Sequence, residues 1–388
     1  MREGWQIRKL GDVCSVRRDS SIHTGMNYVG LEHISSGNGV LVSLADTSGV
    51  IGTTNLFNAG DVLYGKLRPY LKKVIVADCD GCCSTEILPI RCNGDILPDF
   101  LKYWFLEDGI TDKINATCGG CRMPRANMKD VFQFAFAFPS LPEQQRIVDI
   151  LDREFAKIDA LKANTEKSLQ AAKDLFQATT DTMMSNGQWR ELTIGEIAKI
   201  KGGKRVPKGY KLEKEPTAHR YIRVADFTDL GTIRTESVLY ISDEVYKSIK
   251  AYTISSKDVY ISIAGTIGKS GIIPDTLDGA NLTENACKLV LGPNFYNRFV
   301  FFATKTSSFK KQVETLTMQA AQPKLALTRL ATIRVRVPSS IKEQETIVER
   351  LDGIADTIAL LQENYQKALT LCDDLKQSLL RKAFNGEL

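Results

Sequence analysis

The 388-residue chain has no long apolar run, and no segment approaches the roughly 18 apolar residues that a membrane-spanning helix needs. Residues 1–16 are charged and contain no signal-peptide core. These absences predict a cytoplasmic protein. Histidine is scarce, with three residues, and no Ser/His/Asp grouping occurs at a recognisable spacing, so the sequence gives little support to nucleophilic catalysis.

The motifs of the common cofactor and nucleotide enzymes are also missing. There is no glycine-rich dinucleotide fingerprint and no Asn-Pro-Pro-aromatic methyltransferase motif. Gly265–Ser270 looks like a phosphate loop, but the required first glycine falls at Ile263. Asp275 and Glu284 hint at a nuclease carboxylate pair, yet no lysine stands two residues beyond Glu284. We therefore expect a protein that is not an enzyme and holds no cofactor of its own.

Nine cysteines without a secretory signal indicate reduced thiols or metal ligands rather than a disulfide framework. Cys79 with Cys82 and Cys118 with Cys121 have zinc-ligand spacing, but 35 residues separate the two pairs. The second copy of the repeat described next has no cysteines at the matching places. A zinc-dependent enzyme is therefore a minor alternative.

The sequence does contain a large internal repeat, in which segments of residues 1–187 recur in the same order in residues 188–388. The offset grows from 184 near the start to 197, 198 and finally 199–200. The matching pairs are Trp5–Asp12 with Trp189–Glu196, Gly60–Lys72 with Lys257–Lys269, Asp80–Glu86 with Asp278–Glu284, and Pro139–Asp152 with Pro338–Asp352. A unit of this length is far longer than a solenoid repeat, so the chain is a duplicated pair.

Each copy ends in a predicted long helix. Ser140–Glu143 and Ser340–Glu343 fit the capping box, and Asn186-Gly187 and Asn385-Gly386 suit helix ends. About 45 residues without a breaking proline lie between these signals, which corresponds to ~65 Å of helix. Because the first helix leads the chain away and no long linker follows, we expect the second helix to return antiparallel to it.

Apolar and small residues at alternating steps of three and four predict a coiled-coil seam on each helix. In the second helix these are Leu351, Ile354, Ile358, Leu361, Tyr365, Ala368, Cys372, Leu375 and Leu379. In the first they are Leu151, Glu154, Ile158, Leu161, Thr165, Ser168, Ala172, Leu175 and Thr179.

The rest of each copy is predicted to be a mixed α/β head. Helices are expected at Pro98–Leu106 and Phe299–Leu316, and strands at Val62–Tyr64, Val74–Ala77, Ile87–Ile90, Phe132–Phe138, Val259–Ile263, Gly271–Ile273, Cys287–Leu291 and Thr332–Val337. The predicted fold is α+β: two similar mixed α/β domains, 1–139 and 188–338, separated by long antiparallel coiled-coil helices, 140–187 and 339–388, with pseudo-twofold symmetry.

Charge differs along the chain. Residues 187–342 carry 25 basic and 14 acidic side chains, whereas residues 343–388 carry 5 and 9. A basic second head beside acidic helices suits a head that meets phosphates.

Three segments together resemble the specificity subunit of type I restriction–modification systems. They are Pro139–Asp152, its copy at 338–352, and the ending Leu379–Leu388; within the heads, Asp80–Glu86 and Gly265–Lys269 resemble parts of that family's target recognition domains. The resemblance covers the whole chain. It implies that each head reads one half of a split, asymmetric DNA site, and that the helices set the spacing and dock methyltransferase subunits.

Reading bases in a duplex groove needs forked donors or amides, and phosphates are contacted by basic side chains. Candidate loops with such groups are Lys66–Lys73, Cys121–Lys129, Gly202–Lys208 and Gln319–Lys324. The candidate DNA-binding residues are Lys66, Arg68, Lys72, Arg122, Arg125, Lys204, Arg205, Lys208, Lys269, Gln322 and Lys324.

The favoured hypothesis is a non-catalytic DNA-recognition subunit. By resemblance its partners are double-stranded DNA, two adenine methyltransferase subunits that use S-adenosylmethionine, and two restriction subunits that use ATP and Mg²⁺. The alternative is a coiled-coil scaffold that joins proteins without binding DNA.

Overall fold

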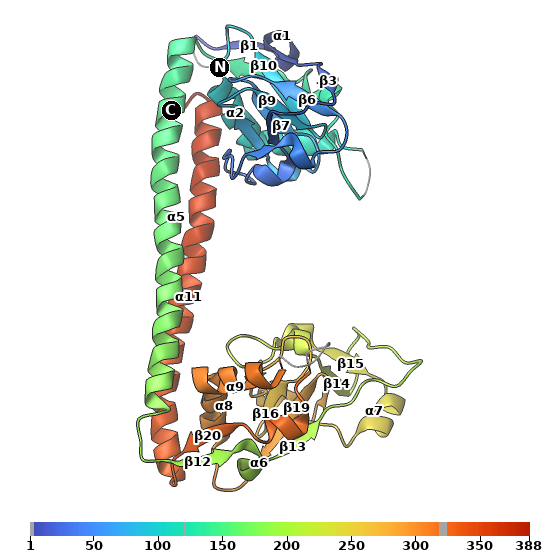
Figure 1. The fold of residues 1–388 in the computed structure, drawn as a ribbon, viewed down its shortest axis with the longest axis vertical. Coiled ribbons are helices and arrows are strands. Elements are labelled where there is room, and N and C mark those ends of the chain that lie inside the picture. Colours follow the sequence, from blue (N-terminus) through green and yellow to red (C-terminus); the bar gives the residue numbers. More distant parts are fainter. Residues whose placement is uncertain (1–3, 120–121, 318–323) are drawn as a thin grey trace. The chain divides into compact units, whose positions relative to one another are not determined.

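The structure is a computed structural model that describes residues 4–119, 122–317 and 324–388. It contains two compact units. The first unit is Met1–Glu166 with Tyr365–Leu388, and the second unit is Lys167–Asn364. Each unit therefore combines one mixed α/β head with one half of each long helix (Figure 1).

The first head is built on two sheets. Its four-stranded antiparallel sheet has the order β2 (Cys14–Val16), β10 (Ile87–Cys92), β7 (Val62–Gly65), β8 (Val74–Val76). The second sheet has the order β3 (Ser20–Ser21), β6 (Thr54–Phe57), β9 (Gly81–Ser84), β4 (Asn27–Val29), β5 (Ala45–Asp46). A separate ribbon pairs β1 (Gln6–Lys9) with β11 (Ala135–Phe138). The helices are α1 (Leu10–Val13), α2 (Pro98–Leu106), α3 (Asp108–Ala116) and α4 (Met128–Val131).

The second head repeats this plan. Its four-stranded sheet has the order β13 (Ala198–Gly202), β19 (Ala286–Leu291), β16 (Val259–Ser262), β17 (Ser270–Gly271). A smaller sheet has the order β15 (Leu239–Ile241), β14 (His219–Ile222), β18 (Asn281–Leu282), and the ribbon joins β12 (Arg190–Thr193) to β20 (Arg334–Val337). The helices are α6 (Ile194–Ile197), α7 (Asp243–Ile249), α8 (Asn297–Lys305), α9 (Ser307–Thr317) and α10 (Leu327–Leu330).

The duplication is confirmed strand by strand, because β2-β10-β7-β8 and β13-β19-β16-β17 have the same order. One part of the sequence alignment was wrong by a residue. Tyr28 pairs with Cys82 in the parallel β4–β9 ladder, and Tyr221 pairs with Asn281 in β14–β18. The offset there is 199 rather than 198, so a one-residue difference in length lies before these strands.

The predicted long helices are α5 (Leu141–Met183) and α11 (Ile341–Phe384). Both begin directly after the predicted cap residue. The amide of Gln144 donates to the Ser140 carbonyl at 2.9 Å, and the amide of Gln344 donates to the Ser340 carbonyl at 3.2 Å. These first helical bonds make both serines N-cap residues.

The antiparallel arrangement is confirmed inside the first unit, where the start of α5 meets the end of α11 (Figure 1). Lys162 pairs with Asp373 at 2.8 Å, and Lys376 pairs with Asp159. The numbers rise along one helix as they fall along the other. In the second unit, the Trp189 indole, just beyond α5, donates to Glu343 at the start of α11 at 2.9 Å.

The predicted seam was wrong at alternate positions. Leu161, Leu175 and Leu375 are 55%, 65% and 49% exposed, whereas Lys376 is only 4% exposed. The buried positions follow Leu151 in steps of four and then three, instead of three and then four. This phase suits helices that pack against a head as well as against each other. A lysine is accommodated because its aliphatic stem packs while its ammonium finds a carboxylate.

Three shorter predictions also need correction. The strand predicted at Phe132–Phe138 begins only at Ala135, because Phe132 and Phe134 turn their carbonyls to the amides of α1. The helix predicted at Phe299–Leu316 is two helices, α8 and α9, separated at Thr306. The strand expected at Gly271–Ile273 is the two-residue β17, one position earlier. Within the described ranges, no helix is long and apolar enough to cross a membrane.

Candidate nucleic-acid interface

Two of the predicted loops lie side by side in the first head. The amide of Lys66 donates to the Glu86 carbonyl and the amide of Ala126 donates to the Lys66 carbonyl, both at 2.9 Å. The amide of Arg68 donates to the Pro124 carbonyl at 2.8 Å. We call residues 66–73 and 122–127 the first loop pair. Backbone bonds therefore bring together basic residues that are about 60 positions apart in sequence.

Arg68 holds an unusual backbone conformation in this loop. Its φ is +52°, and that of Lys72 is +47°; these are the two non-glycine residues with positive φ in the described chain. Non-glycine residues pay a steric cost there, and such strain is concentrated at binding and catalytic sites. Arg68 is exposed, so its guanidinium is displayed to solvent by a constrained backbone.

An acidic residue joins the first loop pair. Arg125 donates to both carboxylate oxygens of Glu86 at 3.0–3.1 Å. This ion pair raises the pKa of Arg125. A bidentate carboxylate fixes the plane of a guanidinium, which is the geometry needed for bidentate contact with a guanine edge.

Lys72, another predicted site residue, is turned toward the protein. Its ammonium donates to the Leu106 carbonyl at 3.1 Å and pairs with Asp108, at the junction of α2 and α3. Lys73 likewise donates to the carbonyls of Leu31 and Ile34. These two lysines hold the base of the loop in place. Lys66 is half-buried, and Arg122 is exposed.

The second head has the same backbone arrangement. The amide of Ile263 donates to the Asn285 carbonyl at 2.8 Å, and the amide of Leu325 donates to the Ile263 carbonyl at 2.9 Å. These bonds correspond to those of Lys66 in the first head. They place exposed Lys324 beside Ala264. We call residues 203–208, 263–264 and 324–325 the second loop group.

The segment after β13 enters this group through a close contact. Gly203 passes so near to β18 that a Cβ there would lie 2.1 Å from the Thr283 carbonyl. Glycine is therefore required, and it directs the following residues over the 283–285 turn. Arg205 then pairs with Glu284, although Arg205 remains 77% exposed. The ammonium of Lys204 lies 5.7 Å from the centroid of the Tyr252 ring, and Lys208 is exposed.

Two predicted residues of the second head stand apart. Lys269 pairs with Asp229 at 2.9 Å and lines a cavity instead of joining Arg205. Gln322 lies outside the described residues. Sequence reasoning missed Glu86 and Glu284. The repeated segments Asp80–Glu86 and Asp278–Glu284 could have pointed to these two carboxylates, since each segment ends in a glutamate. Their arginine partners, however, come from loops that do not correspond in the two copies.

Within the described residues, no group of three or more His, Cys, Asp or Glu side chains is placed to hold a metal ion. Of the cysteines considered as zinc ligands, Cys82 is fully buried in β9 and Cys121 lies outside the described residues.

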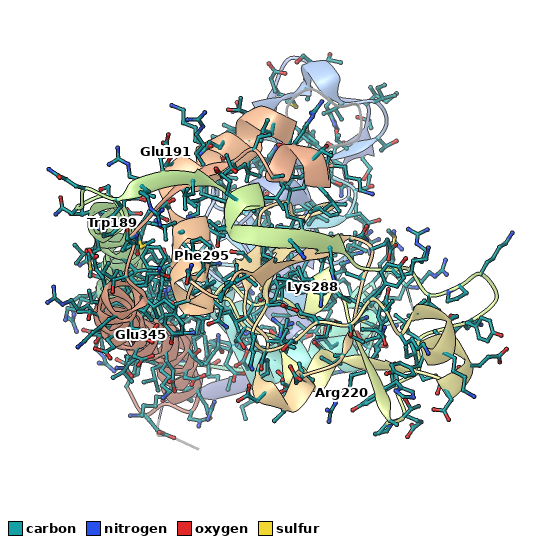
Figure 2. The ribbon with its side chains drawn as sticks, turned by 90° about the horizontal axis from the view of Figure 1, so that it is seen from below. Trp189, Glu191, Arg220, Lys288, Phe295 and Glu345 are labelled. Atoms are coloured by element: carbon teal, nitrogen blue, oxygen red, sulfur yellow. The ribbon has the colours of Figure 1, made fainter. Side chains whose placement is uncertain are left out.

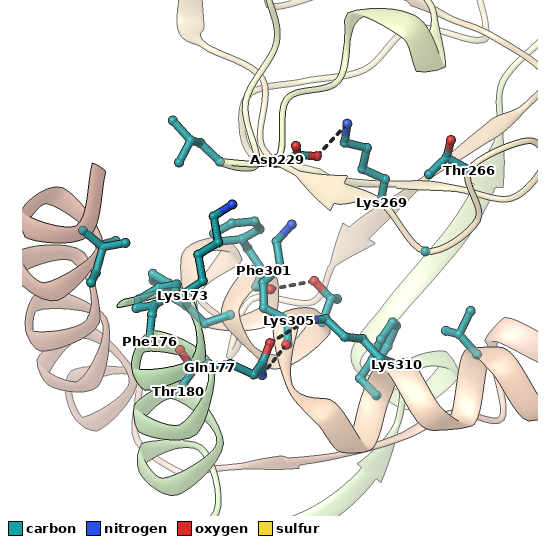
Figure 3. Close-up of a pocket in the computed structure, with 18 of the residues that line it drawn as sticks. Lys173, Phe176, Gln177, Thr180, Asp229, Thr266, Lys269, Phe301, Lys305 and Lys310 are labelled. Atoms are coloured by element: carbon teal, nitrogen blue, oxygen red, sulfur yellow. Dashed lines mark hydrogen bonds and ion pairs between the residues drawn. The ribbon is translucent and has the colours of Figure 1, made fainter. Parts of the chain in front are cut away.

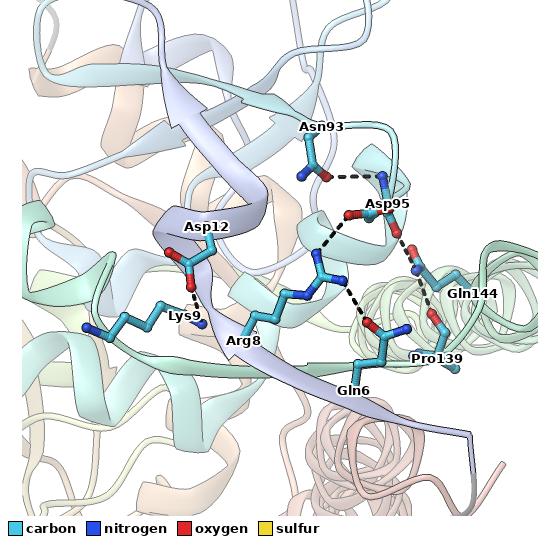
Figure 4. Close-up of polar contacts among 8 residues, drawn as sticks. All are labelled: Gln6, Arg8, Lys9, Asp12, Asn93, Asp95, Pro139 and Gln144. Atoms are coloured by element: carbon cyan, nitrogen blue, oxygen red, sulfur yellow. Dashed lines mark hydrogen bonds and ion pairs between the residues drawn. The ribbon is translucent and has the colours of Figure 1, made fainter.

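Each head is fixed to the helices by one buried glutamine. Gln144 is fully buried, and its side-chain oxygen accepts from the Leu97 amide at 2.9 Å. Its NH₂ donates to the carbonyls of Asp95 and Pro139 at 2.8 and 2.9 Å, as Figure 4 shows. Gln344 makes the matching three bonds to Tyr296, Asn294 and Pro338 at 2.9, 3.1 and 3.2 Å. The loops are therefore carried on heads that are held to the helices by polar contacts as well as by packing.

The second unit is likewise divided into a helical part and a head (Figure 2). Trp189 and Glu345 lie on the side of the helices, whereas Lys288 and Arg220 lie in the head. Lys288 is occupied by Asp258 at 3.0 Å, and Arg220 donates to the Thr276 carbonyl at 2.6 Å. Lys288 is neutralised by its carboxylate, whereas Arg220 is held by a neutral carbonyl and adds to the excess positive charge of this head.

The family model described as "Type I restriction modification DNA specificity domain" matches residues 2–171 and 186–370. The chain belongs to this family. It carries two copies of the specificity domain, as the duplicated sheets require. Each matched range contains one head and most of the long helix that follows it.

Curated relatives of the chain are named specificity subunits of type I restriction enzymes. The chain is 31% identical over 180 residues to the type I restriction enzyme EcoDI specificity subunit of Escherichia coli, a match that covers 43% of this chain and 40% of that relative. It is 23% identical over 386 residues to the EcoBI specificity subunit of Escherichia coli, covering 87% and 78%. The first of these matches thus spans less than half of that specificity subunit.

Solved structures share the fold of this specificity-family chain. A chain from a structure on complex assembly and conformational transition of the type I R-M system matches with a TM-score of 0.82, 21% identity and coverage of 100% and 99%. The HsdS subunit from Thermoanaerobacter tengcongensis matches with a TM-score of 0.55, 21% identity and coverage of 100% and 98%.

Proposed function

We propose that this chain is the non-catalytic DNA-recognition subunit of a type I restriction–modification complex. Each head reads one half of a bipartite, asymmetric duplex site, and the two long helices set the spacing. The single observation that carries this proposal is the recurrence of one loop arrangement in both heads. In each head corresponding backbone bonds join two loops that carry basic residues, and one arginine beside them is held by a carboxylate, although Arg125 and Arg205 come from loops that do not correspond.

The chemistry of these loops suits DNA. Exposed Arg68, Arg122, Lys208 and Lys324 supply phosphate contacts, which give affinity without sequence information. Arg125 and Arg205 are oriented by carboxylates and suit base contacts in the major groove. Glu86 and Glu284 also repel phosphates, so they penalise binding in which the arginines do not meet a suitable base.

The helices offer a surface for protein partners. Exposed leucines lie on them at Leu161, Leu371 and Leu375 in the first unit and at Leu175 and Leu360 in the second, each between 49% and 65% exposed. Apolar side chains repeated along a helix are typical of a surface that another helix covers. We assign this surface to methyltransferase subunits, which supply S-adenosylmethionine chemistry. Restriction subunits with ATP and Mg²⁺ would complete the complex.

The deciding experiment is to express the chain with its methyltransferase subunit and to map methylated adenines across the host genome. We expect a split motif in which two short sequences flank a fixed gap. Replacing residues 188–338 with the corresponding head of a relative should then change one half of the motif and leave the other. Methylation without a motif, or simultaneous change of both halves, would contradict the proposal.

A binding measurement tests the loops directly. In the same complex, Arg68→Ala should lower affinity for all sequences and reduce the slope of log K against log salt by about 1. Arg125→Ala should instead cost about 1–3 kcal/mol against the cognate site and relax specificity. Arg91→Ala, an exposed arginine on β10, is the matched control and should leave both quantities unchanged. A salt-independent affinity would favour the scaffold alternative.

A further inference from the structure

The second unit contains a cavity of about 670 Å³ whose lining includes none of the residues of the second loop group (Figure 3). Its lining residues come from the end of α5, the first half of α11, helices α8 and α9, the loop after β16 and the segment 229–230. Small-molecule sites in proteins usually have volumes of ~300–1,000 Å³. The cavity is therefore large enough for an organic ligand of nucleotide size.

One wall of the cavity is apolar. Phe301, Phe309, Val313 and Ile358 line it and are each 8% exposed or less. Phe176 of α5 also lines the cavity, and Figure 3 shows it together with Phe301 of α8. Aromatic side chains placed around a cavity are suited to pack against a flat ring.

Cations meet at the same cavity from four different elements. They are Lys173 of α5, Lys269 of the loop after β16, Lys305 and Arg298 of α8, and Lys310 of α9; Arg298 is engaged by Asp352 at 2.6 Å. Two carboxylates, Asp229 and Glu314, also line it, so the lysines are in excess. Asp229 is engaged by Lys269 at 2.9 Å. The remaining positive charge suits an anionic ligand.

Lys305 lies deepest in this group. Its ammonium donates to the Ser270 carbonyl at 3.1 Å and sits 5.0 Å from the centroid of the Phe301 ring. Burial, and next the positive charge of Lys310, lower the pKa of Lys305 to about 8. The ammonium of Lys305 is thus short of negative charge, which a phosphate would supply.

A buried hydroxyl provides an independent observation. Thr180 of α5 is 1% exposed and lines the cavity, and its Oγ1 has no hydrogen-bond partner among the described residues. Buried hydroxyls are nearly always hydrogen-bonded in native proteins. A polar ligand atom in the cavity would satisfy Thr180.

The first unit serves as an internal comparison, because the repeat supplies the same positions with different residues. Gln377 donates to the Leu106 carbonyl, as Gln177 donates to the Lys305 carbonyl, so the two sites correspond. There, Phe155 and Leu380 replace Ala355 and Thr180, Leu106 replaces Lys305, and Asp373 replaces Lys173. Phe155 and Leu380 are 8% and 1% exposed, so they fill the space. The open cavity, the hydroxyl of Thr180 that is unpaired among the described residues, and the lysines Lys173 and Lys305 therefore occur together in the second unit, and the first unit has other residues at these positions.

We propose that this cavity binds a small organic phosphate with a flat apolar ring, the chemistry of a nucleoside mono- or diphosphate. The phosphate is neutralised by Lys305, Lys310 and Lys173, and the ring packs on Phe301 and Phe176. A polar atom of the ligand pairs with Thr180. The site is independent of the DNA-recognition proposal.

Isothermal titration of the full chain without DNA tests this directly. Adenosine diphosphate is the probe, and adenosine and pyrophosphate are the two half-ligands. We expect one saturable site for the diphosphate and at least tenfold weaker binding of each half-ligand, because the cavity combines charge with an apolar wall. No saturable binding, or equal binding of pyrophosphate alone, would overturn the proposal.

Variants locate the site. Lys305→Met should weaken diphosphate binding at least tenfold, and Ala355→Phe, which copies Phe155 of the first unit, should fill the cavity and do the same. Lys311→Met removes the same charge from an exposed position of α9 outside the cavity lining, and it should leave binding unchanged. Circular dichroism confirms that each variant is folded. Equal affinity of the Lys305 and Lys311 variants would refute the assignment.

Discussion

Replacing Gln144 with alanine should loosen the first head from the helices and lower the stability of the first unit. Gln144 is fully buried and makes three hydrogen bonds, to the Leu97 amide and to the carbonyls of Asp95 and Pro139, all at 2.8–2.9 Å. The alanine variant leaves those three backbone groups without this partner, in a place that is buried at Pro139 and partly buried at Leu97 and Asp95.

The magnitude follows from these contacts. A buried donor or acceptor left unsatisfied costs about 1–3 kcal/mol, although a carbonyl with a second partner or access to water costs less. We expect roughly 3 kcal/mol in total. For a domain of 150–250 residues, each kcal/mol lowers Tm by about 2–4 °C. The first unit should therefore melt roughly 6–12 °C lower in the Gln144→Ala variant.

Tryptophan fluorescence separates the two units. Trp5 and Trp104 pack in the core of the first unit, and Trp189 packs in that of the second. A Trp189→Phe background therefore reports the first unit alone. A background with Trp5→Phe and Trp104→Phe reports the second unit through Trp189. There Gln344→Ala should lower the transition of the second unit, by a smaller amount because its bonds are longer, at 2.9–3.2 Å.

Gln145→Ala is the matched control. Gln145 is exposed, and its side chain donates to Asp149, one turn away on the same helix, at 2.8 Å. It should shift the first transition by less than 1 °C. If Gln144→Ala melted like Gln145→Ala, or if it lowered the Trp189 transition as much as the first, the glutamine would not be a local anchor of the head.

Three further predictions concern the helices and the cavity. In a urea titration, Asp159→Asn should lower the free energy of unfolding of the first unit by a few kcal/mol, because it leaves the ammonium of Lys376, a residue that is 4% exposed, without its carboxylate. Lys376→Met should leave that free energy nearly unchanged, and an equal loss of stability in the two variants would contradict this reasoning. The pKa of Lys305 is about 8 when folded and ~10.4 when unfolded, so between these values the unfolded chain binds more protons and the stability of the second unit rises with pH. Lys305→Met should flatten that rise in Trp189-monitored titrations at pH 7.5 and 9.5, and an unchanged rise would exclude Lys305 as its source. Inserting about four residues into both long helices should add ~6 Å, or roughly two base pairs, to the gap in the methylation motif, and an unchanged gap would show that the helices do not set it.

The sequence was most informative where local chemistry determines structure. Helix starts were predicted at Ser140 and Ser340 because a capping residue acts within one turn, and both helices begin at the next residue. Pro98–Leu106 was predicted with its observed bounds. The duplication was detectable because two copies retain apolar positions in the same order, which their sheets confirm.

Features that depend on several distant elements were not predictable. The helix seam was misplaced at Leu161 and Leu175 because a coiled-coil pattern assumes one partner, whereas each helix here also packs against a head. The carboxylate partners of Arg125 and Arg205 come from another loop in each case. The cavity requires side chains from α5, α8, α9 and α11 at once, and no single segment carries its pattern.

The first unit is discontinuous in sequence, and this has a consequence for synthesis on the ribosome. All of Lys167–Asn364 is translated before Tyr365–Leu388 emerges. The second unit can thus close while the first still lacks Leu380, Ala383 and Phe384, which pack in its core against residues such as Phe100. Domains made early usually fold early, but here the N-terminal head must wait with part of its interior uncovered until Tyr365–Leu388 has been made. A nonsense mutation near codon 365 would therefore harm the region made first and spare the region made later.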